Sequence, residues 1–197
     1  MNKVDIVIAG VGGQGNLLAS RVLAWAAANA GWEIRTSEAI GMAQREGMVS
    51  SHVRMGKNLR GAIIPDHEAD IVIGLELAET VRAMPKLRPG GLVLCSTTSI
   101  VPVAVTLGET TYDTACLKSY LEQCGERVVF VDATALARQA GNERAANTVM
   151  LGALSRFEDL LPFSGSELRD ALMTIIRPQF KDVNSRAFEL GQQAVEN

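Results

Sequence analysis

The sequence predicts an α/β fold in which a single doubly wound, mostly parallel sheet carries an inserted hairpin and a helical C-terminal region. Three observations indicate this fold. A short β-branched segment, a glycine-rich turn and an Ala/Leu-rich run open the chain, apolar segments then alternate with helical patterns, and everything after Ala133 has helical periodicity. The chain has 197 residues, of which 47% are hydrophobic, so we expect residues 1–197 to form a single domain.

The first elements are a strand, a turn and a helix. Val4–Ala9 is short and β-branched, which is typical of a buried strand, and a run rich in glycine follows it at once. A helix then continues to Ala30, where Gly31 can adopt the left-handed geometry that ends helices. Glu33–Thr36 is a second short strand. Together they form the β-α-β opening of a Rossmann-like sheet, whose ligand crevice lies beyond the carboxyl ends of the strands.

The segment from Met48 to Met55 alternates with period two, which predicts a strand with two different faces. One face carries Ser50, His52 and Arg54, and the other carries Val49, Ser51, Val53 and Met55. Gly56-Lys57-Asn58 has turn composition, and Arg60–Ile64 can return as a second strand before Pro65. We therefore expect an inserted hairpin, or two strands of the sheet, in this part of the chain.

Strands and helices alternate again from residue 70. The expected elements are strands at Asp70–Gly74, Leu92–Ser96 and Val128–Asp132, helices at Glu76–Met84 and Thr114–Cys124, and a turn at Pro89–Gly91. Residues 100–113 have no period and are expected to cross an edge of the sheet. The C-terminal helices are expected at Ala133–Ala140, Glu143–Phe157, Glu167–Ile176 and Phe180–Glu196, separated by Gly141, Pro162 and Pro178.

Composition argues against several classes of protein. Basic residues number 19 against 22 acidic ones, giving a net charge of −3 without a block of like charge, so no nucleic-acid partner is expected. Every apolar run stops well short of the roughly 20 residues that cross a bilayer, and the N-terminus does not resemble a secretory signal, so no membrane partner is expected. Cys95, Cys116 and Cys124 have no CxxC spacing, which favours a reducing cytoplasm and gives too few thiolates for an iron–sulfur cluster.

The glycine turn is the first candidate site. It lies between a strand and a helix, where backbone N–H groups and the helix dipole can bind an anionic group. The candidate cradle consists of Gly10, Gly12, Gly13, Gln14, Gly15 and Asn16. A dinucleotide is disfavoured because the second strand lacks the acidic ribose ligand and Glu38 follows it too late. The turn holds another phosphate, or it only lets helix and strand pack closely.

A second candidate site combines a charged loop with one face of the predicted hairpin. Gln44 and Arg45 lie between two glycines at the edge of the crevice, and Arg45 and Arg54 could clamp a carboxylate or a phosphate. A solvated or interface hairpin explains the same residues equally well. His52 has no nucleophile nearby in a recognisable triad arrangement, so a surface or interface position is favoured for it.

Asn147 is a polar amide in a largely apolar predicted helix. It must either face solvent or find hydrogen-bond partners, and its helix follows the last strand, from where it can reach the crevice. His67 lies among Asp66, Glu68 and Asp70. So many charges in one short loop indicate exposed surface, and no metal site is expected.

Three motifs together resemble one known family. Residues 8–15 (IAGVGGQG), 41–45 (GMAQR) with 51–54 (SHVR), and 147–153 (NTVMLGA) are similar to the gamma-type domain of the 2-oxoacid:ferredoxin oxidoreductases, and within it to the branch that acts on indolepyruvate. The resemblance covers nearly the full chain, so residues 1–197 are expected to be one gamma-type domain. It implies a subunit of a complex that oxidatively decarboxylates aryl pyruvates to aryl-acetyl-CoA. Ile40 and Glu46 stand where family members often have His and Gly, so phenylpyruvate, indolepyruvate and branched 2-oxoacids stay open as substrates.

The resemblance also implies a division of labour between subunits. A larger alpha subunit would carry thiamine diphosphate, Mg and the iron–sulfur clusters, coenzyme A would be a co-substrate, and ferredoxin would accept the electrons. This chain would bind no cofactor by itself and would be inactive alone. It is expected to close a wall of the active site or of the coenzyme A site with Gln44, Arg45, Ser51, His52 and Arg54. Two other classes stay open: an independent NAD(P)-dependent oxidoreductase and a purely structural scaffold subunit.

Overall fold

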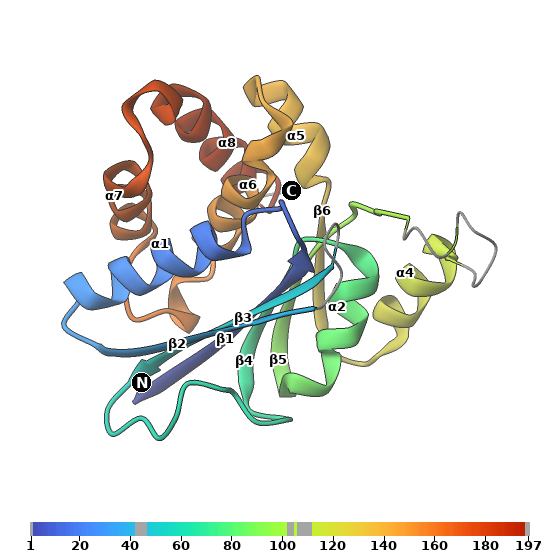
Figure 1. Ribbon diagram of the computed structural model, residues 1–197, viewed down its shortest axis with the longest axis horizontal. Coiled ribbons are helices and arrows are strands. Elements are labelled where there is room, and N and C mark those ends of the chain that lie inside the picture. Colours follow the sequence, from blue (N-terminus) through green and yellow to red (C-terminus); the bar gives the residue numbers. More distant parts are fainter. Residues whose placement is uncertain (1, 42–46, 102–104, 106–111, 196–197) are drawn as a thin grey trace.

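The computed structural model describes residues 2–41, 47–101, 105 and 112–195. In these residues six strands form one sheet of order β2-β3-β1-β4-β5-β6 (Figure 1). The strands are β1 (Lys3–Val11), β2 (Glu33–Ile40), β3 (Met48–Gly56), β4 (Ala69–Gly74), β5 (Leu87–Ser96) and β6 (Arg127–Val131). β1, β4, β5 and β6 run parallel, and β3 pairs antiparallel with β1 and β2. The predicted α/β class and the mostly parallel sheet are confirmed.

Helices cover both faces of the sheet (Figure 1). On one side of the sheet lie α1 (Asn16–Asn29), α5 (Ala133–Ala140), α6 (Ala146–Leu154), α7 (Gly165–Ile175) and α8 (Lys181–Gln193), and on the other lie α2 (Leu77–Ala83) and α4 (Thr114–Gln123). On the first side α1 and α6 contact the strands, whereas α7 packs on α1 and α8 packs on α6. Short 3-10 turns occupy Met84–Lys86, Glu143–Ala145, Glu158–Leu160 and Pro178–Phe180. From β1 the chain leads through α1 toward β2, and from β4 it leads through α2 toward β5. The strand order therefore reverses between β1 and β4, which is where open α/β sheets bind ligands.

The hydrophobic core has two parts, one under each layer of helices. Successive side chains of a strand point to opposite faces, so Ile6 and Ile8 of β1 pack toward α1, whereas Val7 packs toward α2. On the α1 side, α6 and α8 cross so closely that a Cβ atom at Gly191 would overlap the Val149 carbonyl oxygen. Glycine at this crossing lets the backbones of the two helices touch.

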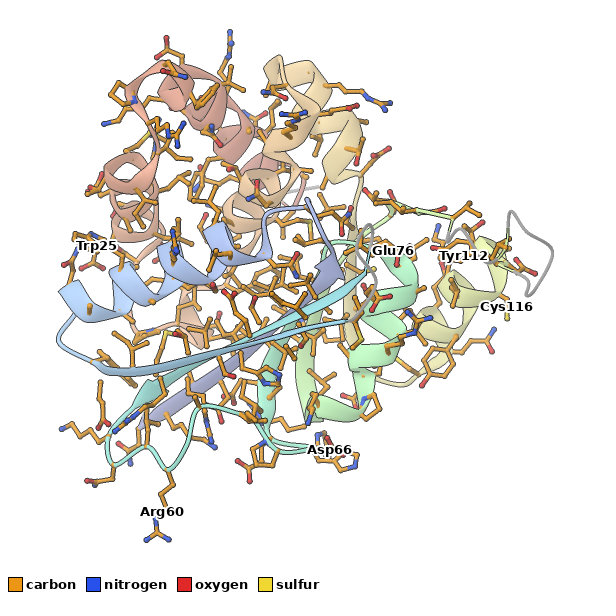
Figure 2. All side chains as sticks on the ribbon, in the orientation of Figure 1. Trp25, Arg60, Asp66, Glu76, Tyr112 and Cys116 are labelled. Atoms are coloured by element: carbon orange, nitrogen blue, oxygen red, sulfur yellow. The ribbon has the colours of Figure 1, made fainter. Side chains whose placement is uncertain are left out.

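The second strand of the expected hairpin does not form, and this part of the prediction was wrong. Arg60–Ile64 belongs instead to a loop between β3 and β4, because β3 is already paired on both sides, with β1 and with β2. Gly61 also has a φ of 73°, which interrupts an extended conformation. Arg60 points from this loop into solvent (Figure 2). The antiparallel hairpin of the structure is formed by β2 and β3.

Three further element boundaries differ from those expected, and one is the end of β2, which continues to Ile40 instead of ending at Thr36. Pro89–Gly91 lies inside β5 as a bulge and does not precede the strand, because the pairing with β4 shifts register between Ala69 and Ile71. The helix expected over Glu143–Phe157 is a 3-10 turn followed by α6, which ends at Leu154. The other C-terminal helices lie within one turn of their expected bounds. No helix among the described residues is long and apolar enough to span a membrane.

Candidate functional site

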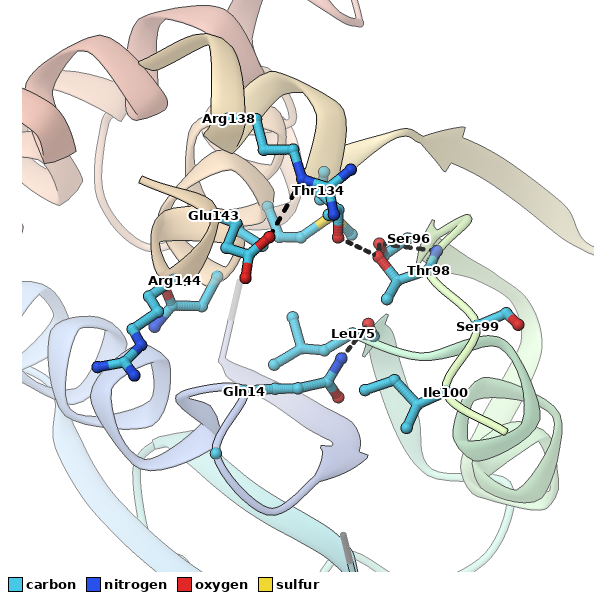
Figure 3. Close-up of a pocket in the computed structure, with 15 residues that line it drawn as sticks. Gln14, Leu75, Ser96, Thr98, Ser99, Ile100, Thr134, Arg138, Glu143 and Arg144 are labelled. Carbon is cyan, nitrogen blue, oxygen red and sulfur yellow. Dashed lines mark hydrogen bonds and ion pairs between the residues drawn. The ribbon is translucent and has the colours of Figure 1, made fainter. Parts of the chain in front are cut away.

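A cavity of about 360 Å³ opens at the carboxyl ends of the parallel strands (Figure 3). The glycine turn after β1, the residues that follow β4 and β5, and the first turns of α5 and α6 line it. Leu75, Ile100 and Met150 supply its apolar surface. The cavity borders the point between β1 and β4 where the strand order reverses, so it occupies the crevice that the sequence predicts for a ligand.

The glutamine of the glycine turn bridges two strand ends. Gln14 Oε1 accepts a hydrogen bond from the Val11 N–H at 2.8 Å, and Gln14 Nε2 donates to the Leu75 carbonyl oxygen at 2.9 Å. The side chain therefore ties the end of β1 to the residue that follows β4. Gly10 makes room for it, because a Cβ atom there would lie 2.7 Å from Gln14 Oε1.

Only part of the predicted anion cradle faces the cavity. Gly13, with a φ of 93°, lines the cavity beside the glutamine. The Gly12 N–H donates to the Gly47 carbonyl oxygen at 2.9 Å, and the buried Asn16 donates through Nδ2 to the Val49 carbonyl oxygen at 3.0 Å. These groups bind the protein's own backbone and hold the turn against β3.

Asn147 connects the glycine turn to the C-terminal helices. It is 3% exposed at the start of α6, its Nδ2 donates to the Gly15 carbonyl oxygen at 3.2 Å, and its Oδ1 accepts from the Thr148 N–H at 2.9 Å. A Cβ atom at Gly15, where φ is 86°, would overlap Asn147 Nδ2. The structure thus brings this predicted crevice residue to the wall of the cavity, and glycine at position 15 permits the approach.

A row of hydroxyl groups lines the side of the cavity formed by β5 and α5. Ser96 Oγ lies 2.8 Å from Thr98 Oγ1, which in turn lies 2.7 Å from Thr134 Oγ1 (Figure 3). Each hydroxyl can donate and accept, so the row can reorient to bind a polar ligand. Sequence reasoning missed these residues, although four hydroxyl-bearing residues in succession at 96–99, directly after a predicted strand, were an available signal.

Charged side chains of α5 and of the turn before α6 also line the cavity (Figure 3). Arg138 Nε donates to Glu143 Oε2 at 3.1 Å, and the two side chains are 67% and 61% exposed. Such an exposed pair contributes little to stability, so Arg138 can exchange this partner for an anionic ligand. Arg144 forms no ion pair with any residue that the structure describes. Neither arginine was predicted, because no sequence pattern separates them from other surface arginines.

The residues of the predicted active-site wall do not gather at this cavity. Gln44 and Arg45 lie outside the described residues. Ser51, His52 and Arg54 lie on β3, and none of them lines the cavity. Ser51 is fully buried, and its Oγ has no hydrogen-bond partner among the described residues.

Arg54 and His52 bind other parts of the same chain. Arg54 is 6% exposed, and its Nε and Nη2 donate to the two carboxylate oxygens of Asp5, each at 3.0 Å. Its Nη1 donates to the Ile63 carbonyl oxygen at 3.2 Å, while His52 Nδ1 accepts from the Ile64 N–H at 3.2 Å. Burial lowers the pKa of His52, and neighbouring positive charges lower it further. Arg54 thus binds a carboxylate through two nitrogen atoms, as the sequence suggested. This carboxylate is Asp5 of the same chain and not a ligand.

The donor groups of the described residues do not fit a metal ion or an iron–sulfur cluster. No three His, Cys, Asp or Glu side chains come together within that part of the chain. Cys95 is buried, which raises the pKa of its thiol to about 12, whereas Cys116 is exposed on α4. In the charged loop, Asp66 pairs with Lys86 at 2.7 Å. These residues therefore do not form a ligand set for the magnesium ion of thiamine diphosphate or for a cluster.

Comparison with known sequences gives a match along nearly the whole chain. The sequence model of the family described as pyruvate ferredoxin/flavodoxin oxidoreductase matches residues 5–194. The chain is 40% identical over 196 residues to indolepyruvate oxidoreductase subunit IorB of Thermococcus kodakarensis, and the alignment covers 98% of this chain and 96% of that subunit.

Solved structures share the fold at lower sequence identity. The gamma subunit of keto/oxoacid ferredoxin oxidoreductase from Geobacter sulfurreducens superposes with a TM-score of 0.70 at 22% identity, covering 98% of each chain. The 2-oxoglutarate:ferredoxin oxidoreductase from Magnetococcus marinus, with 2-oxoglutarate, coenzyme A and succinyl-CoA bound, superposes with a TM-score of 0.74 at 20% identity. It covers 100% of this chain but only 31% of that longer one.

Proposed function

Because the chain belongs to the pyruvate ferredoxin/flavodoxin oxidoreductase family, we propose that it is the gamma-type small subunit of a complex that oxidises indolepyruvate. Its membership confirms the family resemblance of the sequence motifs. The assignment to indolepyruvate rests on one observation: the chain is 40% identical, over 98% of its length, to a subunit named for indolepyruvate. We further propose that residues 1–197 form one gamma-type domain.

The proposed reaction is the oxidative decarboxylation of the 2-oxoacid. The bond between the carboxylate carbon and the oxo carbon breaks and releases CO₂, and the remaining acyl carbon forms a thioester with coenzyme A. Two electrons pass to ferredoxin, and the thiol proton of coenzyme A is released. We assign thiamine diphosphate, magnesium and the iron–sulfur clusters to a larger alpha subunit, since the described residues of this chain do not form a donor set for them.

We propose that the cavity at the carboxyl edge of the sheet takes part of coenzyme A. Arg138 and Arg144 offer positive charge to its phosphates, and the hydroxyl row offers donors and acceptors to its amide groups. A protein of the same fold has coenzyme A bound. The cavity of about 360 Å³ lies near the lower end of the range of about 300–1,000 Å³ for ligand pockets. The rest of so large a molecule would therefore lie against the larger subunit.

The hairpin remains a proposed wall of the active site or of the coenzyme A site, with different roles for its residues. Ser51, His52 and Arg54 would hold β3 and its loop in shape, because their side chains are buried and two of them bind the protein itself. Gln44 and Arg45, from the connection between β2 and β3, would contact the partner or the substrate. The variant Arg45→Ala should then lower the turnover rate of the assembled complex. Unchanged turnover would favour a scaffold role for the hairpin.

Co-purification tests the proposed assembly. The tagged chain, isolated from its native source, should carry with it a larger polypeptide that binds thiamine diphosphate and shows iron–sulfur absorbance. If calorimetry instead gives tight, saturable binding of NAD(P) to the purified chain, the dinucleotide-dependent oxidoreductase would be the better assignment.

Coenzyme A binding tests the proposed role of the cavity. Arg144→Ala should weaken coenzyme A binding to the complex by about tenfold, as expected for loss of a hydrogen bond to a charged group. Arg21→Ala is the matched control, because Arg21 is exposed on α1 and does not line the cavity. Equal affinities for the two variants would contradict a coenzyme A site at this cavity.

A further inference from the structure

One buried carboxylate joins three segments beside the cavity. Glu76 is 1% exposed in the turn between β4 and α2. Its Oε2 accepts a hydrogen bond from the Glu79 N–H at 2.9 Å, and its Oε1 accepts from the Ile100 N–H at 3.2 Å and from the Tyr112 hydroxyl. Figure 2 shows Glu76 near the start of α2 and Tyr112 at the approach to α4. The carboxylate thus connects α2 with chain that follows β5 and with chain that precedes α4.

Residues 98–100, which we call the strap, line the cavity and depend on this carboxylate. At the first residue of the strap, the Thr98 carbonyl oxygen accepts from the Leu77 N–H at 3.0 Å. At its last residue, Ile100 donates its N–H to Glu76. Tyr112 donates its hydroxyl hydrogen to the same Glu76 oxygen that accepts from Ile100. The first and last residues of the strap are therefore fixed at the start of α2, one by the Leu77 N–H and the other by the Glu76 carboxylate.

We infer that Glu76 and Tyr112 are positioning residues that hold the strap in the shape required for ligand binding. Neither side chain lines the cavity, so Glu76 acts through Ile100, and Tyr112 acts by holding the Glu76 carboxylate in place. The identity of the ligand as coenzyme A rests on the proposed function, but the positioning of the strap does not.

The hydrogen bonds that Glu76 accepts are expected to persist throughout the neutral pH range. A buried carboxylate is costly unless donors surround it, and Glu76 has two backbone N–H groups and one phenol hydroxyl as donors. Burial raises the pKa of Tyr112, and the neighbouring Glu76 carboxylate raises it further. The phenol therefore stays protonated and donates its hydrogen bond throughout the neutral range.

The test is Tyr112→Phe in the reconstituted complex. Loss of a hydrogen bond to a charged acceptor should raise the KM for coenzyme A by about tenfold, while kcat stays within about twofold because no reacting group is removed. Tyr120→Phe is the matched control: the chain has two tyrosines, and Tyr120 is 51% exposed and does not line the cavity. An unchanged KM in Tyr112→Phe, or an equal rise in Tyr120→Phe, would overturn the inference.

Two readouts do not need coenzyme A. In the isolated Tyr120→Phe chain, Tyr112 is the one remaining tyrosine, so an alkaline absorbance titration reports its ionisation. Glu76→Gln should shift that ionisation to lower pH because the neighbouring negative charge is lost. Amide exchange of Ile100 should become faster in Tyr112→Phe. If both changes occur in the isolated chain but the complex does not bind coenzyme A, the proposed ligand is wrong and the positioning role stands. If neither occurs, the positioning role itself is refuted.

Discussion

Replacing Asp5 with Asn should destabilise the protein by about 3–5 kcal/mol, the cost of removing one partner from a buried ion pair. Asp5 is fully buried, and both of its carboxylate oxygens accept hydrogen bonds from Arg54, which is 6% exposed. The variant leaves the buried guanidinium with only the half-exposed Glu68 carboxylate, 3.5 Å from Nη2, as an opposite charge. Because a domain of this kind has a total stability of about 5–15 kcal/mol, the loss should be large in any unfolding experiment.

Urea unfolding followed by circular dichroism measures this loss. Arg35→Met is the surface control, because Arg35 is 53% exposed in its pair with Glu33 and should change stability by less than about 1 kcal/mol. Asp5→Leu combined with Arg54→Met should recover most of the stability, since apolar residues of similar size can replace a buried pair. A cost below about 1 kcal/mol for Asp5→Asn would refute the structural role of Arg54. Its guanidinium would then be accessible to water and to the ligand that the sequence suggested for it.

Three further predictions concern packing, pH and thiol chemistry. Gly191→Ala should lower the free energy of unfolding by about 1–3 kcal/mol, because the added methyl group overpacks the crossing of α8 with α6. A melting temperature equal to that of the wild type would contradict this close crossing. The folded-state pKa of His52 lies below the ordinary 6.5, so its contribution to stability is fully present above that pH and is lost as the pH falls toward the folded pKa. The stability advantage of the wild type over His52→Asn should therefore shrink on acidification, and a pH-independent difference would count against it. A thiol reagent should modify the exposed Cys116 in the native protein and modify Cys95 only after unfolding, because burial raises the pKa of the Cys95 thiol to about 12; rapid native labelling of Cys95 would disprove its burial.

The parts of the fold that sequence predicts well are those set by local pattern. The β-branched run of β1, the glycine turn and the helix after it are encoded within the first thirty or so residues, and their periodicity is unambiguous. The α5 helix matches its predicted bounds, since Asp132 caps its first turn and Gly141 ends it. Strand pairing is not local. Arg60–Ile64 has a strand-like composition, but β3 has no free edge for it.

At the site, the sequence likewise predicts the chemical role of a residue but not the partner that the residue binds. A bidentate role for Arg54 was readable from its type and position, but its internal partner Asp5 is 49 residues away in sequence. Similarly, an amide at Asn147 required partners, and the structure supplies Gly15, which is 132 residues away. The hydroxyl row and the Glu76 contacts depend on loops meeting in space, which no sequence spacing reveals.

Electron transfer measured with the isolated chain, with the larger subunit alone and with the two mixed tests the division of labour most directly. The substrates are indolepyruvate and coenzyme A, and the readout is reduction of ferredoxin. We expect no reduction by this chain alone, and coenzyme A-dependent reduction by the mixture at a rate well above that of the larger subunit alone. Sustained reduction by the isolated chain, or a rate of the larger subunit that does not change on mixing, would contradict the proposed role of this subunit.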